Sequence, residues 1–193
     1  KLNYLAAAGV TFMLLVALNR EARVQNYKNI PDLFDYLDLA ALGTICDVVP
    51  LKGLNRAIVK QGLKVLSRES NIGLKSLMFE TNTKSPITPY HCGFVLGPRI
   101  NAGGRIGKAN IGAELLSTEN PQLAIKHAQE LDRVNIERRI IQDKILDEAL
   151  LKAFSVNKTN SIIVVGMEGW HPGVIGIVAG RLKDRFNKPV IVI

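Results

Sequence analysis

The chain has 193 residues, of which 47% are hydrophobic and 22% charged, and this balance excludes an intrinsically disordered chain. Its 25 Lys and Arg outnumber its 17 Asp and Glu, giving a net charge of +8 that suits an anionic partner such as nucleic acid without identifying one. Cys46 and Cys92 have no CxxC spacing and form no disulfide framework, so a reducing cytoplasm is the simplest location.

The first element is the apolar run of residues 5–18, LAAAGVTFMLLVAL. Its 14 residues fall short of the roughly 20 needed to span a membrane, and the run has neither the basic start nor the cleavage site of a signal peptide. We expect a buried helix and no membrane association. Because the chain starts without Met on a helix that needs a domain to cover it, we also expect the sequence to begin partway through a longer protein.

A polar segment, residues 19–29, leads to a second predicted helix over residues 32–42. Gly43 is expected to stop this helix, and residues 44–51, TICDVVPL, are expected to form a β-rich or turn segment. Residues 53–68 follow with apolar positions at helical spacing and basic residues between them. This pattern predicts an amphipathic helix with a solvated cationic face.

Residues 80–92 contain Asn, Thr, Ser and two prolines and are predicted to form a loop. The next segment, residues 93–112, is so rich in glycine that we expect neither helix nor strand. Backbone of this kind usually lies close to another backbone or to a ligand.

Asn120 and Pro121 are a typical N-cap and first-turn pair, and residues 121–154 contain no further Gly or Pro. At 1.5 Å per residue the predicted helix would be roughly 50 Å long, which is long enough to connect two domains. Its apolar residues form one stripe, and Arg133, Arg138, Arg139 and Lys144 are expected to lie off that stripe.

The spacing of apolar residues changes near the end of the chain. Residues 161–166, SIIVVG, predict a buried strand, residues 173–186 an amphipathic helix, and residues 189–193, PVIVI, a second buried strand. Strand, helix and strand in this order predict a parallel βαβ unit with a right-handed crossover. The sequence ends within that sheet, so we expect further strands in the parent protein.

Asp47 is the first candidate for a functional residue, because its carboxylate lies between the apolar residues Ile45 and Val48. A carboxylate in apolar surroundings is costly unless it is paired or bound to a metal. An Asp that caps a turn through its own backbone is the competing interpretation.

Arg99, Asn101 and Arg105 form a second candidate site within the glycine-rich segment. Two guanidinium groups and an amide on glycine-rich backbone are suited to phosphate. The alternative is a structural segment whose arginines pair with carboxylates of the same domain. No Walker motif is present, because no GK[ST] follows the glycines.

The third candidate is the segment GWHPG, residues 169–173, placed after a predicted strand and before a helix, where α/β folds often bind anions. His171 could donate to a phosphate oxygen, and Arg181 two turns along could reach the same side. Trp170 is either a stacking platform for a base or a packing residue. His91 and His127 are expected to be solvated.

Three strings containing these candidates, DLAALGTICDVVPL, GPRINAGGRIGKA and EGWHPGVIGIVAGRL, occur in the order of similar strings in the RecJ family and at plausible separations. The similarity extends over nearly the whole chain. The chain therefore resembles RecJ single-strand DNA exonucleases of the DHH phosphoesterase superfamily.

The resemblance implies an α/β fold with three parts. Residues 1–119 would be the C-terminal part of a DHH domain, residues 120–154 a long connecting helix, and residues 155–193 the first βαβ unit of a DHHA1 domain. It also implies two Mn²⁺ or Mg²⁺ ions and processive 5′ to 3′ hydrolysis of single-stranded DNA in repair and recombination, in a cleft too narrow for duplex.

The same resemblance assigns roles to the candidate residues. Asp47 matches a metal ligand, and Asp47 and Arg105 are the expected catalytic residues. Arg99, Asn101 and Arg105 would hold phosphates of the strand. The remaining substrate-binding residues would be Trp170, His171, Gly173 and Arg181.

Neither the DxD aspartates nor the DHH histidines of the family occur in these 193 residues. We therefore expect the chain alone to be inactive and the remaining metal ligands to lie upstream of Lys1. We also expect a monomer. Helicases and single-strand-binding proteins are the candidate partners. The alternatives are a related phosphodiesterase acting on short oligonucleotides, cyclic dinucleotides or pyrophosphate, and a non-catalytic relative that binds single-stranded DNA.

Overall fold

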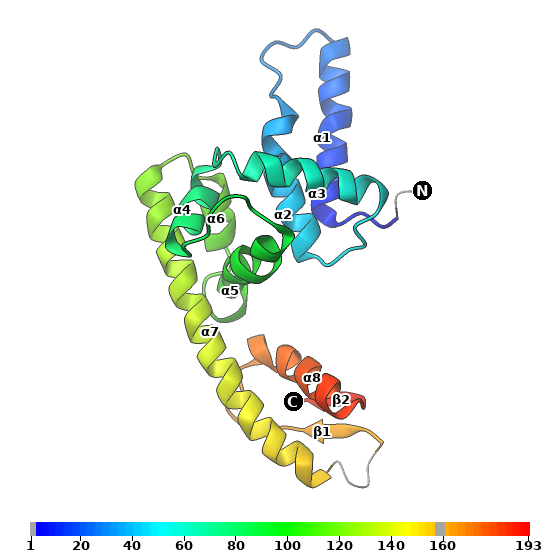
Figure 1. The fold of residues 1–193 in the computed structure, drawn as a ribbon, viewed down its shortest axis with the longest axis vertical. Coiled ribbons are helices and arrows are strands. Elements are labelled where there is room, and N and C mark those ends of the chain that lie inside the picture. Colours follow the sequence, from blue (N-terminus) through cyan, green and yellow to red (C-terminus); the bar gives the residue numbers. More distant parts are fainter. Residues whose placement is uncertain (1–2, 157–160) are drawn as a thin grey trace.

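The computed structural model describes residues 3–156 and 161–193, and it is mostly helical with one small parallel sheet. The helices before the long connecting helix are α1 (Ala7–Val24), η1 (Leu33–Tyr36), α2 (Leu37–Cys46), α3 (Gly53–Leu66), α4 (Ile72–Glu80), η2 (His91–Leu96), α5 (Gly97–Ile106) and α6 (Ile111–Ser117). The long helix and the unit behind it are α7 (Pro121–Val156), β1 (Ile163–Val165), α8 (Pro172–Phe186) and β2 (Val190–Val192) (Figure 1).

Helix α7 runs from the helical part of the molecule to the C-terminal α/β unit and confirms the predicted long helix (Figure 1). Asn120 caps its start, because the side-chain Oδ1 accepts hydrogen bonds from the backbone N–H groups of Gln122 and Leu123 at 2.9 and 3.1 Å. The first half of α7 is buried against α4, α5 and α6, and the second half against β1 and α8. One helix thus contributes to two separate hydrophobic cores.

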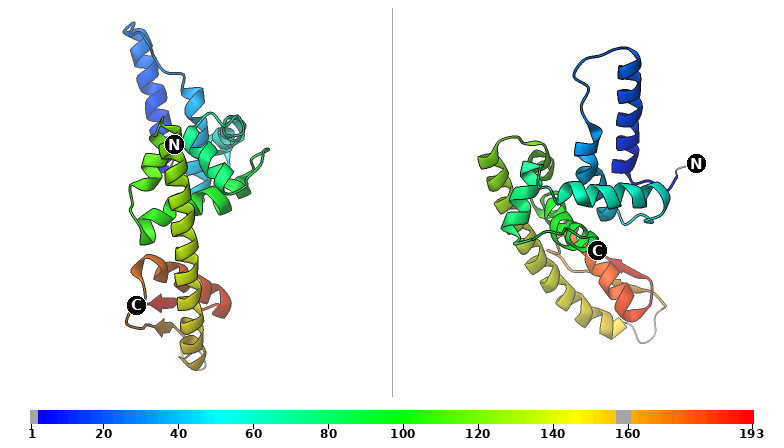
Figure 2. Two further views of the ribbon diagram at one scale, coloured as in Figure 1. Left: turned by 90° about the vertical axis from the view of Figure 1, so that its left-hand side faces the viewer. Right: turned by 45° about the horizontal axis from the view of Figure 1, so that its top comes forward.

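Helix α1 is present as predicted, but the expectation that it is buried is wrong in this chain. It runs on to Val24, into the first half of the segment predicted to be polar, and Gly9 is its one buried residue. The helix packs on α2 near its start and then projects away from the other helices, leaving Val10, Leu14 and Leu18 exposed (Figure 2). Among the described residues, no helix has the length and apolarity that crossing a membrane requires.

The prediction that Gly43 ends the second helix is also wrong, because α2 continues through it to Cys46. Gly43 lies so close to Ala8 of α1 that an added Cβ would be 2.6 Å from the Ala8 Cβ. The glycine serves this close helix contact rather than a turn. Helix α3 agrees with the prediction, and its Arg56 and Lys60 are exposed.

The glycine-rich segment is helical, contrary to expectation. The loop before it ends at residue 88, and the π-helical turn η2 leads directly into α5. The helix tolerates the glycines because close packing requires them: a Cβ on Gly97 would collide with the Cys46 Sγ of α2, and one on Gly112 would lie 2.9 Å from the Ile100 carbonyl oxygen. The expected close approach to other backbone is therefore confirmed.

The C-terminal βαβ unit is confirmed, with β1 and β2 parallel and Ile163 opposite Val190. The prediction of a sheet buried on both faces is wrong for the part described. Ile163 and Val165 pack against α7 and α8, whereas Val164 and Ile191 on the other face are exposed. The proposed domain boundary at residue 155 falls beside residues 157–160, which lie outside the described residues.

The contact between α2 and α3 gives a test of this packing. A Cβ on Gly62 of α3 would collide with the Leu37 carbonyl oxygen and with Ala41 of α2, so we expect Gly62→Ala to lower the free energy of unfolding by about 1–3 kcal/mol. Gly104→Ala is the control, because Gly104 is also helical and has nothing within 4 Å of an added Cβ. Urea denaturation of the two variants should separate them. Equal stability would show that the two helices can move apart at no cost.

Candidate phosphate-binding cleft

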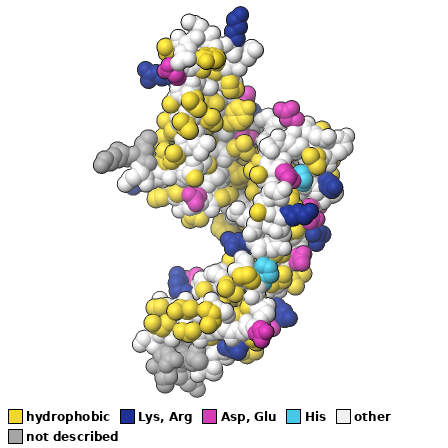
Figure 3. Space-filling view, turned by 180° about the vertical axis from the view of Figure 1, so that it is seen from behind, with side chains coloured by type: hydrophobic (Ala, Val, Ile, Leu, Met, Phe, Trp, Pro, Cys, Tyr) yellow, Lys and Arg dark blue, Asp and Glu magenta, His cyan; other side chains and the backbone are white. Residues whose placement is uncertain are grey.

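A cleft of about 570 Å³ lies where α5, α7 and α8 meet. Its polar lining consists of four arginines, two amides and one carboxylate: Arg105, Arg138, Arg139, Arg181, Asn101, Gln142 and Asp143. Seen from behind, the molecule is hollowed between the helical part above and the α/β unit below (Figure 3). The excess of guanidinium groups over carboxylates makes this cleft a place for an anion.

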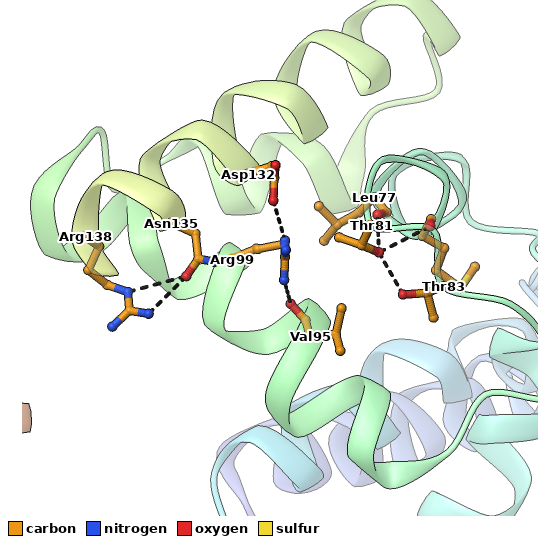
Figure 4. Close-up of polar contacts among 9 residues, drawn as sticks. Leu77, Thr81, Thr83, Val95, Arg99, Asp132, Asn135 and Arg138 are labelled. Atoms are coloured by element: carbon orange, nitrogen blue, oxygen red, sulfur yellow. Dashed lines mark hydrogen bonds and ion pairs between the residues drawn. The ribbon is translucent and has the colours of Figure 1, made fainter. Parts of the chain in front are cut away.

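Arg138 is the buried member of this group. Only 8% of the residue is exposed, and its guanidinium donates to Gln142 Oε1 at 2.7 Å and to Asn135 Oδ1 at 3.2 Å (Figure 4 draws the Asn135 contact). Burial, and then the neighbouring charges of Arg139, Arg105 and Arg181, lower the pKa of Arg138 below its usual value. Its hydrogen-bond partners are neutral, so the positive charge in the cleft is poorly compensated.

Arg99 does not reach this cleft. Its Nε donates to Asp132 Oδ1 of α7 at 2.7 Å and its Nη1 to the Val95 carbonyl oxygen at 2.8 Å, as Figure 4 shows. The side chain braces α5 against α7, which is the structural role considered for these arginines. The structure brings Asn101 and Arg105 together in the cleft and places Arg99 on the opposite side of α5.

Arg105 also connects the two parts of the molecule. Its Nη1 donates to the Gly173 carbonyl oxygen at 3.2 Å, although the two residues are 68 positions apart. A side chain on Gly173 would collide with the Arg105 carbonyl oxygen. The end of α5 therefore touches the start of α8, and the cleft lies beside this contact.

His171 caps α8, because its Nδ1 accepts the backbone N–H of Gly173 at 3.0 Å. It lines a second pocket of about 390 Å³, whereas Arg181 lines the cleft. Trp170 is 9% exposed and donates its indole N–H to Glu148 Oε2 at 2.8 Å. These contacts support the packing interpretation of Trp170 over a stacking platform.

Asp47 lies at the C-cap of α2, next to Cys46 of the cleft lining. Its carboxylate is exposed and makes no hydrogen bond or ion pair with the described residues, so it does not cap a turn. The following residue, Val48, has a φ of 54°, which is rare for a β-branched side chain and ends the helix abruptly. A carboxylate at the negative end of a helix dipole is unfavourable by itself, and a bound cation offsets this repulsion.

Within the described residues, no group of three or more His, Cys, Asp or Glu side chains could hold a metal ion. Asp47 can therefore supply one ligand but cannot form a metal site with its neighbours here. The two cysteines are reduced, and burial raises the pKa of Cys92 to about 12, with a smaller contribution from Cys46.

Sequence reasoning missed three features. It placed Arg138 off the buried stripe of α7, although the residue is buried, and it gave Arg139 no role. It did not single out Asp38, which is buried at the start of α2, accepts the Leu39 N–H at 2.6 Å and has its pKa raised by burial. It also expected a solvated His127, whose side chain is largely buried and lies 3.6 Å from a Glu114 oxygen.

The geometry defines an arginine-rich cleft between a helical scaffold and a small α/β unit, and solved structures share this architecture. RecJ from Thermus thermophilus in complex with Mn²⁺ aligns with a TM-score of 0.79 and 34% identity, over 89% of this chain and 25% of that one. An exonuclease RecJ bound to manganese aligns with a TM-score of 0.78 and 36% identity, over 86% of this chain and 42% of that one.

Sequence comparison gives the same result, although no family model matches the chain. The RecJ single-stranded-DNA-specific exonuclease of Bacillus subtilis is 41% identical over 190 residues, which is 98% of this chain and 23% of the relative. RecJ of Escherichia coli is 37% identical over 97% of this chain and 34% of the relative. The chain is thus similar to RecJ over nearly all its length, and it spans about a quarter to a third of these relatives.

The brace between Arg99 and Asp132 can be tested by a double-mutant cycle. Arg99→Gln leaves the partly buried carboxylate of Asp132 without its partner, so we expect the free energy of unfolding to fall by about 1–3 kcal/mol. Asp132→Asn should cost a similar amount, and the double variant less than the sum of both. Arg133→Gln, which removes exposed ion pairs on the same helix, is the control and should change stability little. Strict additivity in chemical denaturation would contradict the brace.

Proposed function

We propose that the cleft between α5, α7 and α8 holds the phosphates of single-stranded DNA in an exonuclease. The observation that carries this proposal is the cluster of Arg105, Arg138, Arg139 and Arg181, three of them exposed, around a cleft with one carboxylate. Guanidinium forks match phosphate oxygens, and several of them in a row follow a nucleic-acid backbone. The name shared by the relatives, single-stranded-DNA-specific exonuclease, gives the substrate class.

In this proposal residues 1–119 form part of a DHH catalytic domain, residues 120–154 the connecting helix, and residues 155–193 the beginning of a DHHA1 substrate-binding domain. Helix α7 supports this division because its two halves pack in different cores. The strand would run between the two parts, with Arg105 on one side and Arg181 on the other.

Asp47 would be one ligand of a divalent metal site. Its carboxylate fits this role because it is exposed, without a partner among the described residues, and fixed at the C-cap of α2 beside the cleft. RecJ structures contain Mn²⁺ or Mg²⁺, and the other ligands would come from family segments that these 193 residues do not contain. Bound metal would supply a hydroxide nucleophile and stabilise charge on the phosphate.

The chain's own residues would position the strand for hydrolysis. Arg105 would hold the reacting phosphate beside Asp47 while Asn101 donates to a neighbouring oxygen. The Nδ1 of His171 is occupied as an acceptor, so its neutral ring carries the proton on Nε2 and can donate to a phosphate further along. Gly173 would keep α5 and α8 close, and Trp170 would support the wall. The intact enzyme would degrade DNA from the 5′ end in repair and recombination, with helicases or single-strand-binding proteins supplying the strand.

Binding of a 5′-labelled single strand, followed by fluorescence anisotropy across a salt series, tests the cleft. We expect Arg181→Gln to weaken binding and to reduce the slope of log K against log salt by about 0.7, the value for one phosphate contact on a single strand. Arg185→Gln is the matched control, since Arg185 lies on the same helix next to the Phe154 ring and outside the cleft. Identical salt slopes for parent and Arg181→Gln would refute the phosphate contact.

The incomplete ligand set predicts that these 193 residues alone do not hydrolyse single-stranded DNA in the presence of Mn²⁺. Release of nucleotides from a 5′-labelled strand, measured with and without a chelator, checks this expectation. Chelator-sensitive hydrolysis by the purified chain would overturn it.

In a longer protein that carries the remaining ligands, Asp47→Asn should reduce the hydrolysis rate at least about 100-fold. Strand binding should be largely retained, because the carboxylate serves the metal rather than the DNA. A full rate at saturating Mn²⁺ would contradict the metal-ligand role, and a large loss of affinity with an unchanged rate would place Asp47 in strand binding instead.

A further inference from the structure

Two aromatic side chains, Tyr90 and Phe94, stand exposed at the start of the segment that carries Asn101 and Arg105. They are 63% and 67% exposed, and their rings stack with centroids 5.2 Å apart and planes inclined by 25°. Neither residue belongs to a hydrophobic core in the described part of the chain. Two exposed rings that stack on each other form a small apolar surface that a flat ligand can contact.

The position of the pair connects it with the cleft. Phe94 lines the cleft together with Arg105, Arg139 and Arg181, whereas Tyr90 stacks on Phe94 from one residue before η2. The π-helical turn of η2 runs into α5 without a break, so the ring and the cationic side chain of Arg105 are carried on one continuous helical segment. Short π-helical turns often occur at functional sites.

The combination of a ring and a cationic groove has a specific chemistry. Proteins that bind single strands pair a positively charged groove for the phosphates with aromatic side chains on which the bases stack. Trp170 cannot take this role, because its indole is buried and its N–H donates a hydrogen bond to the Glu148 carboxylate. Phe94 is the exposed aromatic ring in the lining of the cleft.

We propose that Phe94, supported from behind by Tyr90, is a stacking platform for a nucleobase of the strand whose phosphates occupy the arginine cleft. This inference rests on the proposed function and deepens it by assigning a site for the base. Stacking depends on the flat face that every base shares, so the platform accepts all four bases. Bases of a duplex already stack on one another, so the platform selects unpaired nucleotides.

The test compares two strands of equal length and charge in binding to the 193-residue chain, one with normal bases and one with abasic sites. The parent chain should prefer the strand with bases, and Phe94→Leu should lose on the order of tenfold affinity for it while binding the abasic strand unchanged. Phe79→Leu is the control, because Phe79 is 86% exposed on α4 and lies outside the cleft lining. It should behave as the parent chain.

A second variant, Phe94→Trp, keeps a flat ring and adds a reporter. It should bind the normal strand at least as tightly as the parent, and its added fluorescence should be quenched by that strand and not by the abasic one. Equal affinity of parent and Phe94→Leu for the normal strand, or equal quenching by both strands, would overturn the platform while leaving the phosphate cleft intact. Failure of the parent to bind either strand would overturn the proposed function and the platform with it.

Discussion

The burial of α7 on two sides is the constraint on which the rest of the structure depends. Ala124 and Ala128 near its start pack in one hydrophobic core, and Ala149 and Ala153 near its end pack in the other. Small side chains at these positions let neighbouring helices and β1 come close to the α7 backbone. Between the two cores the buried face of the helix turns polar, with Asn135, Arg138 and Gln142, and the cleft opens beside this polar stretch. A single continuous helix therefore fixes where the two cores end and where the binding site lies.

The elements that sequence could predict are those whose signals are local. The N-cap at Asn120, the stripe on α7 and the period change in the C-terminal βαβ unit each depend on residues a few positions apart. Two of the failures concern glycines. Gly43 and Gly97 appeared as helix breakers, but each lies inside a helix because another part of the chain occupies the space of a side chain. Glycine composition alone cannot distinguish a flexible backbone from one that is tightly covered.

The candidate site was predictable in its residue types and less so in its grouping. Asn101, Arg105 and Arg181 were selected from the sequence and lie in one cleft, whereas Arg99 turns to Asp132. Arg99 and Arg105 are six residues apart, so in a helix their side chains point in different directions, and the expectation of a loop concealed this difference. Arg138 and Arg139 were noted on the long helix but were not assigned to the site, because only the packing of α7 on α5 brings them there.

The contact between Arg105 and Gly173 fixes the distance between α5 and α8 beside the cleft. Main-chain atoms of the two helices meet there with no room for a side chain, so a change of rotamer cannot alter their separation. The arginine side chains around the cleft can still change rotamer to follow a ligand. Helix spacing at this point is thus set by backbone contact, whereas the positive charge of the cleft is carried by side chains.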